Sequence, residues 1–189
     1  MPDRRIRSFV AFEIGEAGVL KRIADAQRAL VDTGADLRLV KPENIHVTVR
    51  FLGDISPIMA DMVRSEMNGI LFRPFEIELR GLGAFPDLRH ARVIWIGIKR
   101  GRETLMKIFD QLEGRLRKLG FTPDRRGFSP HVTIARVKSR ENRDLLIRQI
   151  VSRCDYDFGT VKANSLKLME SVLTPKGPVY STLHEVRAT

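Results

Sequence analysis

The chain has 189 residues, a length typical of one domain or of two small lobes that share a core. Hydrophobic residues make up 43% and charged residues 30% of it, which excludes a disordered or collagen-like chain. Lys and Arg number 33 against 23 Asp and Glu, a formal net charge of +10, so an acidic partner or substrate is expected.

The first half of the chain predicts a mixture of strands and helices. In chain order we expect a strand at 5–14, a helix at 16–31, strands at 37–40 and 45–52, and a helix at 57–71. The run Asp32-Thr33-Gly34 ends the first helix, Lys41-Pro42-Glu43-Asn44 has the composition of a turn, and Pro57 suits the start of the second helix.

The second half continues this mixture. It predicts strands at 75–82 and 92–98, a helix at 102–119, a strand at 131–137, a helix at 141–153, and strands near 157–170 and 179–186. The helix at 102–119 has the clearest pattern, because its apolar residues fall on one face and Gly120 ends it. Since strands and helices do not alternate strictly, the order favours an α+β fold with largely antiparallel sheets.

The sequence lacks the signatures of several protein classes. There is no GxxxxGK[ST] loop, and Gly81-Leu82-Gly83 lacks the third glycine of a dinucleotide fingerprint, so no nucleotide cofactor is expected. The single cysteine, Cys154, allows neither an internal disulfide nor a Cys-based zinc site. No apolar run approaches the ~20 residues that span a bilayer, and the N-terminus does not read as a signal peptide. We therefore expect a cytoplasmic protein without a membrane partner.

The most informative feature is a repeated His-x-Thr tripeptide. Residues 44–49 read Asn-Ile-His-Val-Thr-Val and residues 129–134 read Ser-Pro-His-Val-Thr-Ile, with the two histidines 85 positions apart. Residues i and i+2 of a strand point to the same face, so His46 projects with Thr48 and His131 projects with Thr133. If the two halves are related by approximate two-fold symmetry, both pairs converge on one cleft.

Two histidines and two hydroxyls suit the hydrolysis of a phosphodiester. One imidazole can activate the attacking water while the other protonates the leaving alkoxide, and hydroxyl and guanidinium groups can hold the phosphate oxygens. This chemistry requires no metal. A metal site is the rival interpretation, with His90 and His184 as spare ligands, but neither lies in a matching pattern. A Ser-His-Asp arrangement stays open, although no GxSxG elbow is present.

These residues resemble the 2H phosphoesterase family, and within it the RNA 2′,3′-cyclic phosphodiesterases, also called 2′-5′ RNA ligases. The resemblance covers nearly the whole chain and rests on the strand 7–12, the two motifs with their flanks at 46–53 and 131–136, and Gly177-Pro178-Val179-Tyr180. It implies one bilobal domain over residues 1–189, with one His-x-Thr motif per half. It also implies two pseudo-symmetric antiparallel sheets with helices on their outer faces around a central cleft.

The resemblance further implies the substrate and the residue roles. Family members open a terminal 2′,3′-cyclic phosphate on RNA to a 2′-phosphate and can run a ligation that makes 2′-5′ linkages. By carry-over, His46 is the proton donor to the leaving 3′-oxygen and His131 is the proton acceptor, although the near symmetry of the motifs leaves the assignment of acid and base open. Thr48, Thr133 and Arg136 bind the phosphate. No cofactor is implied, and we expect a monomer.

Strand parity raises a question about two arginines. Arg136 is an odd five positions after His131, so a bulge or the strand's end must turn it toward the same face. Arg50 shares the parity of His46, which makes it either a substrate contact or a solvent-facing arginine.

Aromatic and loop residues complete the candidate site. Tyr180, Phe9 and Phe51 can stack on a base, although the apolar neighbours of Phe9 and Phe51 favour core packing for these two. Arg125 and Arg126 precede the second motif and can guide an RNA backbone, or they can be solvated.

The charge distribution keeps other functions open. Residues 1–94 carry 14 basic and 13 acidic side chains, whereas residues 95–189 carry 19 and 10. A basic half of this kind also fits a non-catalytic RNA-binding module. A third possibility is a phosphoesterase of small cyclic nucleotides or of ADP-ribose cyclic phosphate, which the length of the preferred substrate would distinguish.

Overall fold

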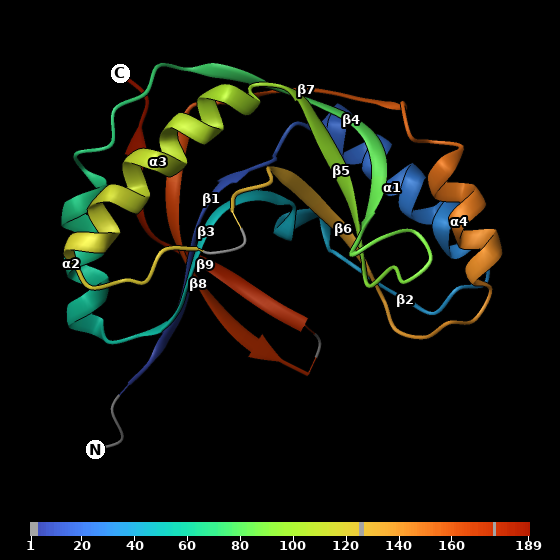
Figure 1. Ribbon diagram of the computed structural model, residues 1–189, viewed down its shortest axis with the longest axis horizontal. Helices are drawn as coiled ribbons and strands as arrows, with labels where there is room; N and C mark the ends of the chain where they lie inside the picture. The colour runs from blue at the N-terminus through green and yellow to red at the C-terminus, as the bar shows by residue number, and fades with distance from the viewer. Residues whose placement is uncertain (1–3, 125–126, 176) are drawn as a thin grey trace.

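The computed structural model describes residues 4–124, 127–175 and 177–189. Its helices are α1 (Ala17–Val31), the 3-10 helix η1 (Pro42–Asn44), α2 (Pro57–Met67), α3 (Arg102–Lys118) and α4 (Arg143–Val151). Its strands are β1 (Ile6–Glu13), β2 (Leu37–Leu39), β3 (His46–Ile55), β4 (Phe75–Phe85), β5 (Val93–Arg100), β6 (His131–Val137), β7 (Asp157–Ala163), β8 (Ser165–Thr174) and β9 (Gly177–Arg187). The predicted α+β class is confirmed (Figure 1).

Within the described residues, the strands form one antiparallel sheet in the order β7-β4-β5-β6-β3-β1-β8-β9, with β2 paired to β6. Its two halves meet between β3 and β6, where Val47 pairs with Val132. The two sheets expected from the resemblance are therefore the two halves of a single curled sheet. Because β3 and β6 pair only near their first residues, each half is free to curve away from the other, which produces the arch in Figure 1.

The helices cover the outer face of this arch in two pairs. Helices α2 and α3 lie outside the half formed by β1, β3, β8 and β9, which we call the first lobe (Figure 1). Helices α1 and α4 lie outside the half formed by β2 and β4–β7, which we call the second lobe. Helix α1 thus comes from the start of the chain but packs in the second lobe. Each lobe is built from both halves of the chain.

The segment predicted as a strand near 157–170 is two strands that serve different lobes. The chain breaks at Asn164, after which β7 pairs with β4 in the second lobe and β8 pairs with β1 in the first. The second predicted helix is also shorter than expected, since α2 ends at Met67 and Asn68 caps it. The residue pattern does not reveal this break. Both β7 and β8 are half-buried strands, so buried and less buried residues alternate on either side of Asn164.

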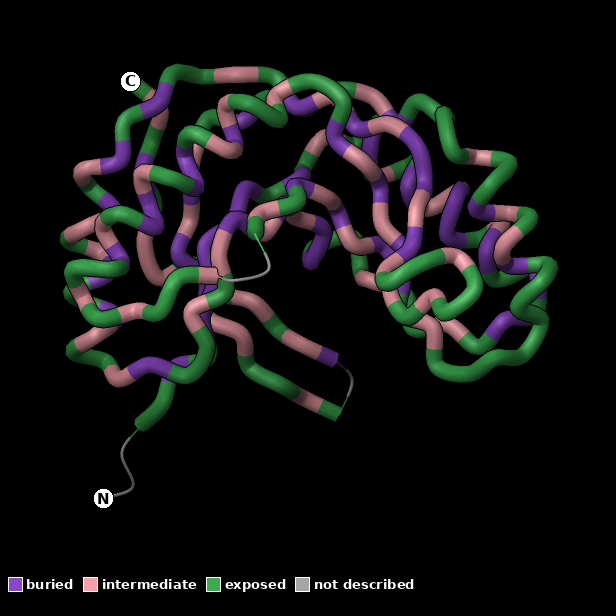
Figure 2. Tube along the Cα trace, in the orientation of Figure 1, coloured by how far each residue is buried: buried purple, intermediate pink, exposed green. Residues whose placement is uncertain are grey.

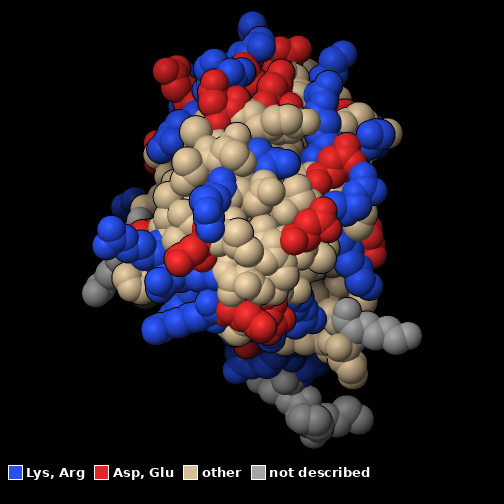
Figure 3. All heavy atoms as spheres, turned by 90° about the vertical axis from the view of Figure 1, so that its right-hand side faces the viewer, with Lys and Arg blue, Asp and Glu red and all other residues tan. Residues whose placement is uncertain are grey.

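The core lies between the sheet and the helices, where Figure 2 shows the buried segments of both lobes. It contains one amphipathic face of each helix, represented by Ile23, Val63, Leu112 and Ile150. No described helix has the length and apolar character required to cross a membrane. Figure 3 views the second lobe from outside and shows a largely uncharged centre with both acidic and basic side chains around it.

Candidate active site

Both histidines project from the inner face of the arch, next to the pair that joins its halves. His46 is the first residue of β3 and His131 the first of β6. Val47 and Val132 have no exposed surface and point into the core. Their neighbours in the strands must point the other way, so the two imidazoles face the open side. The strand pairing therefore brings the two motifs together, as the repeat predicts.

Main-chain carbonyls orient the two imidazoles in the same way. The Nδ1 atom of His46 lies 2.7 Å from the carbonyl oxygen of Asn44, and that of His131 lies 2.7 Å from the carbonyl oxygen of Ser129. A carbonyl oxygen only accepts, so Nδ1–H donates in both cases. In the neutral form each Nε2 atom then carries the lone pair and can accept a proton.

The surroundings of the two Nε2 atoms differ. The hydroxyl of Thr48 lies 2.9 Å from Nε2 of His46 and donates to it when the ring is neutral. For Nε2 of His131 no hydrogen-bond partner is found among the described residues. Thr133 lies on the same face, opposite Trp95 in the pairing of β5 with β6. His131 is thus the imidazole whose lone pair is open to the cleft.

Aromatic rings enclose His46 on the first lobe. The centroid of Phe9 lies 4.9 Å from that of the imidazole, and the centroid of Tyr180 lies 5.4 Å away in an edge-on arrangement. Tyr180 comes from β9, and the side-chain amide of Asn44 donates to the carbonyl of Pro178 in the same strand at 2.9 Å. Asn44 therefore contacts both His46 and the strand that carries Tyr180.

A second pair of rings encloses His131. The centroid of Phe85 lies 5.0 Å from the imidazole and that of Trp95 lies 6.4 Å away. Sequence reasoning missed both residues. The sequence predicts strands at 75–82 and 92–98, but nothing local in Phe85 or Trp95 indicates that these strands lie beside β6.

Burial lowers the pKa of both histidines below the usual 6.5, because the charged imidazolium loses its hydration. For His46 the bond to the Asn44 carbonyl and the charge of Glu13 act in the opposite direction, while the charge of His131 lowers the pKa further. Glu13 favours the protonated form of His46, the form that a general acid needs.

These pKa shifts predict the pH dependence of activity. For a pair in which one histidine acts as acid and the other as base, kcat/KM follows a bell whose limbs report the free enzyme's pKa values. Since both pKa values are lowered, we expect the maximum below pH 6.5. In Glu13→Gln the pKa of His46 falls further, so the maximum moves to lower pH. Initial rates from pH 4.5 to 8.5 test this, and a maximum above pH 7 contradicts it.

A bulge in β3 changes which residues face the cleft. Ala11 pairs with Thr48 and its neighbour Val10 pairs with Arg50, so Val49 is an additional residue in β3 that has no partner in β1. Beyond the bulge, Phe51 pairs with Phe9 and lies on the face of the histidines. Phe9 is 4% exposed and packs as expected, but Phe51 is 62% exposed, so the core position expected for Phe51 is wrong.

The same bulge turns Arg50 to the outer face. Its guanidinium pairs with Glu113 of α3 and donates to the carbonyls of Phe51 at 2.9 Å and Thr122 at 2.6 Å. The expectation that Arg50 shares the face of His46 is wrong, because strict alternation fails between Thr48 and Arg50. Arg50 connects the sheet to α3 and to the segment before the second motif.

A matching bulge in β6 turns Arg136 toward the cleft, as strand parity requires. Thr133 pairs with Trp95 and Ala135 with Ile94, so Ile134 is the additional residue. The carbonyl of Ile134 accepts a bond from the buried amide of Gln27 in α1 at 2.8 Å. Gln27 thus stabilises the bulge. Arg136 and Phe51 occupy equivalent places, three residues after the threonine of each motif.

Arg136 and Arg7 lie near Tyr180. Burial raises the pKa of its phenol, and the positive charges of Arg136 and Arg7 act against that rise. Arg38 lies opposite Arg136 where β2 pairs with β6. Arg7 and Arg38 were not predicted, because only the sheet brings them beside the motifs. Arg125 and Arg126 lie outside the described residues.

The remaining histidines lie elsewhere. His90 contacts Asp87 at 3.1 Å in the exposed loop after β4, and Nε2 of His184 donates to the side-chain oxygen of Asn68 at 2.7 Å. The described part of the chain holds no group of three or more His, Cys, Asp and Glu side chains arranged to bind a metal.

Known proteins resemble this chain in sequence and in fold. A family model described as AKAP7 2'5' RNA ligase-like domain matches residues 8–187. A protein of Aeropyrum pernix named RNA 2′,3′-cyclic phosphodiesterase is 40% identical over 167 residues, which cover 88% of this chain and 95% of that protein. One of the same name from Methanothermobacter thermautotrophicus is 34% identical over 187 residues, 97% of this chain and 99% of that protein.

Solved structures show the same fold. A protein of Thermus thermophilus superposes with a TM-score of 0.81 at 25% identity, covering 96% of this chain and 97% of that one. Escherichia coli LigT complexed with 3′-AMP superposes with a TM-score of 0.80 at 19% identity, covering 98% and 99%.

Proposed function

This chain belongs to the 2H phosphoesterase family, and from that premise we propose that it hydrolyses the terminal 2′,3′-cyclic phosphate of RNA to a 2′-phosphate. The observation that supports the proposal is the pair of imidazoles on one face of the sheet, each held by a carbonyl at Nδ1, so that Nε2 is the atom that exchanges a proton. The names of the curated relatives supply the substrate class.

In the proposed reaction, His131 is the base. Its open Nε2 atom takes a proton from water while the water oxygen bonds to phosphorus. The bond from phosphorus to the 3′-oxygen breaks, and Nε2–H of His46 donates its proton to that oxygen. The products are a 2′-phosphate and a 3′-hydroxyl, and proton exchange with solvent restores both histidines. The charge of Glu13 supports His46 as the acid.

Neighbouring groups would bind the phosphate. Thr48 and Thr133 place hydroxyls beside the two imidazoles, and Arg136 adds a positive charge beside Tyr180. Such donors stabilise charge that develops on the phosphoryl oxygens in the transition state. The exposed ring of Phe51 is available to stack on a base. Arg50 has no part in this proposal, since it faces α3.

Ligation follows from the same steps. If the 5′-hydroxyl of a second RNA attacks in place of water, the 3′-oxygen leaves and the new linkage joins the 2′-oxygen to that 5′-oxygen. Because both histidines and their ring neighbours come from one chain, we propose that the monomer is the active unit.

Product identity and chelator resistance test the function. With a short oligoribonucleotide that ends in a 2′,3′-cyclic phosphate, we expect turnover to a 2′-phosphate at an unchanged rate in millimolar EDTA. Chromatography against 2′- and 3′-phosphate standards identifies the product. Loss of activity in EDTA with recovery on adding zinc contradicts the two-histidine mechanism. Binding of the RNA without turnover favours a binding module, and turnover of small cyclic nucleotides alone favours the third possibility.

A further inference from the structure

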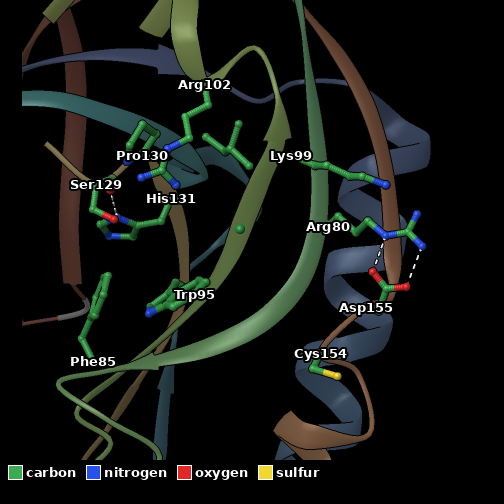
Figure 4. Close-up of a pocket in the computed structure, with 12 residues that line it drawn as sticks. Arg80, Phe85, Trp95, Lys99, Arg102, Ser129, Pro130, His131, Cys154 and Asp155 are labelled. Carbon is green, nitrogen blue, oxygen red and sulfur yellow. Dashed lines mark hydrogen bonds and ion pairs between the residues drawn. The ribbon is translucent and has the colours of Figure 1, made fainter. Parts of the chain in front are cut away.

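A pocket of about 270 Å³ adjoins His131. It is lined by β4, β5, the first residue of α3, and the segments before β6 and β7, including Arg80, Phe85, Trp95, Lys99, Arg102 and His131 (Figure 4). Strand β6 lies between β5 and β3 in the sheet. The pocket is therefore on the far side of His131 from the strand that carries His46.

Two glycines allow close packing of the strands and of the Trp95 indole beside His131. Gly97 pairs directly opposite His131, and a Cβ atom there would lie 2.8 Å from the Arg80 carbonyl oxygen. A Cβ atom on Gly83 would lie 2.3 Å from the indole of Trp95. The indole therefore lies close against the sheet and forms a wall on which a planar ring can stack.

The equivalent position on the first lobe is occupied. Glu13 pairs opposite His46 as Gly97 pairs opposite His131, and its carboxylate forms an ion pair with Lys167. A carboxylate repels a phosphate, so the side of His46 cannot offer the same environment. The two-fold similarity of the motifs is broken at this point.

Cationic side chains surround the pocket. Arg102 is exposed, points toward His131 in Figure 4 and has no ion-pair partner among the described residues. Lys99 points away from His131, toward Arg80 and Asp155 (Figure 4), and lies 4.0 Å from Glu78. Arg80 is already neutralised by two bonds to Asp155, at 2.5 and 2.8 Å. Arg102 and Lys99 are thus the charges available to a phosphate.

The in-line geometry of nucleophilic displacement at phosphorus determines which part of a substrate lies next to this pocket. The attacking and leaving oxygens lie roughly in line across phosphorus. With His46 at the leaving 3′-oxygen, the ribose of the cyclic nucleotide lies on the His46 side and the attacking oxygen on the His131 side. A water molecule needs no cationic pocket with an indole wall, but a nucleotide does.

We propose that this pocket binds the 5′-terminal nucleotide of a second RNA strand, the nucleophile of a ligation. Its base packs against Trp95, the phosphodiester that follows it contacts Arg102, and the next phosphodiester of the strand extends toward Lys99 at the other end of the pocket. Its 5′-hydroxyl gives a proton to His131 and bonds to phosphorus, the bond to the 3′-oxygen breaks, and His46 protonates that oxygen. The product is a 2′-5′ phosphodiester, and the energy comes from opening the cyclic phosphate. This inference rests on the proposed function.

The test compares two products from one reaction. An RNA with a 2′,3′-cyclic phosphate is mixed with a trinucleotide that has hydroxyls at both ends, and the 2′-phosphate and the ligated strand are quantified. Removing both charges in Lys99→Gln/Arg102→Gln is expected to lower the ratio of ligation to hydrolysis about tenfold, with hydrolysis within about twofold. The control Arg117→Gln/Lys118→Gln removes two exposed charges from the end of α3 and is expected to match the wild type.

A second readout is inhibition of hydrolysis. The trinucleotide occupies the place of the attacking water, so it should inhibit hydrolysis in the wild type and about tenfold less in the double variant. Two results overturn the inference: no ligated product from the wild type at millimolar trinucleotide, or a double variant that loses hydrolysis of the oligonucleotide but not of a mononucleoside cyclic phosphate. The latter assigns the pocket to the strand being cleaved. A wild type that hydrolyses neither substrate refutes the proposed function instead.

Discussion

Replacing either His46 or His131 with alanine is expected to reduce kcat on an RNA with a 2′,3′-cyclic phosphate by about 10²–10⁴-fold, because each variant loses one proton-transfer group. The double variant should fall little further, since an acid without a base and a base without an acid are both ineffective. Each single variant should also lose one limb of the bell-shaped pH profile. Single-turnover rates across pH measure both effects.

His90→Ala is the matched control for this prediction. It removes an imidazole that contacts Asp87 in an exposed loop, so activity should match the wild type. Comparable losses in all three single variants would indicate a general loss of structure, which unfolding curves reveal. A wild-type rate in either His46→Ala or His131→Ala is incompatible with the paired mechanism.

Replacing Arg50 with methionine is expected to destabilise the fold by about 3–5 kcal/mol, because it leaves a buried carboxylate without its partner. The side chains of Arg50 and Glu113 are only 11% and 8% exposed. The substitution also removes two bonds to main-chain carbonyls. Urea unfolding at pH 7 measures the change in the free energy of unfolding.

The Arg50 prediction has two controls. Arg117→Met alters an exposed arginine of α3 and should change stability by no more than about 0.5 kcal/mol. In Arg50→Met/Glu113→Leu no unpaired charge is buried, so part of the lost stability should return. If Arg50→Met instead raises KM and leaves stability unchanged, Arg50 binds substrate as strand parity first allowed.

Local patterns in the chain were sufficient for most elements. Apolar periodicity predicted the helix at 102–119, observed as Arg102–Lys118, and the alternation at 131–137 predicted β6. Two-residue alternation is a strong signal where one face of a strand is buried. The prediction of one strand near 157–170 failed for a different reason. Both β7 and β8 are half-buried strands, and only their pairing in different lobes separates them.

The candidate site also has a part that local patterns predict and a part that depends on strand pairing. The repeat of His46-Val47-Thr48 and His131-Val132-Thr133 was sufficient to predict two imidazoles on one cleft and their reactive class, because chemistry follows from residue type and spacing. Strict alternation along the strand placed Arg50 on the face of His46, which is wrong. For Arg136 to reach the face of His131, the same alternation required a bulge or the end of the strand. Both outcomes depend on one-residue bulges, which depend on hydrogen bonds between strands far apart in the chain.

The order of amino acids was thus sufficient for the fold class, the two motifs and the chemistry that they suit, since propensity, alternation and the ability of a histidine to transfer a proton are properties of the residues and their near neighbours. Tertiary structure alone decided that each lobe takes strands and helices from both halves, that Phe51 rather than Arg50 faces the cleft, and that Trp95, Arg102 and Gly97 form a pocket beside His131. These features require strand register and close packing between distant segments, and no local pattern in the chain encodes either.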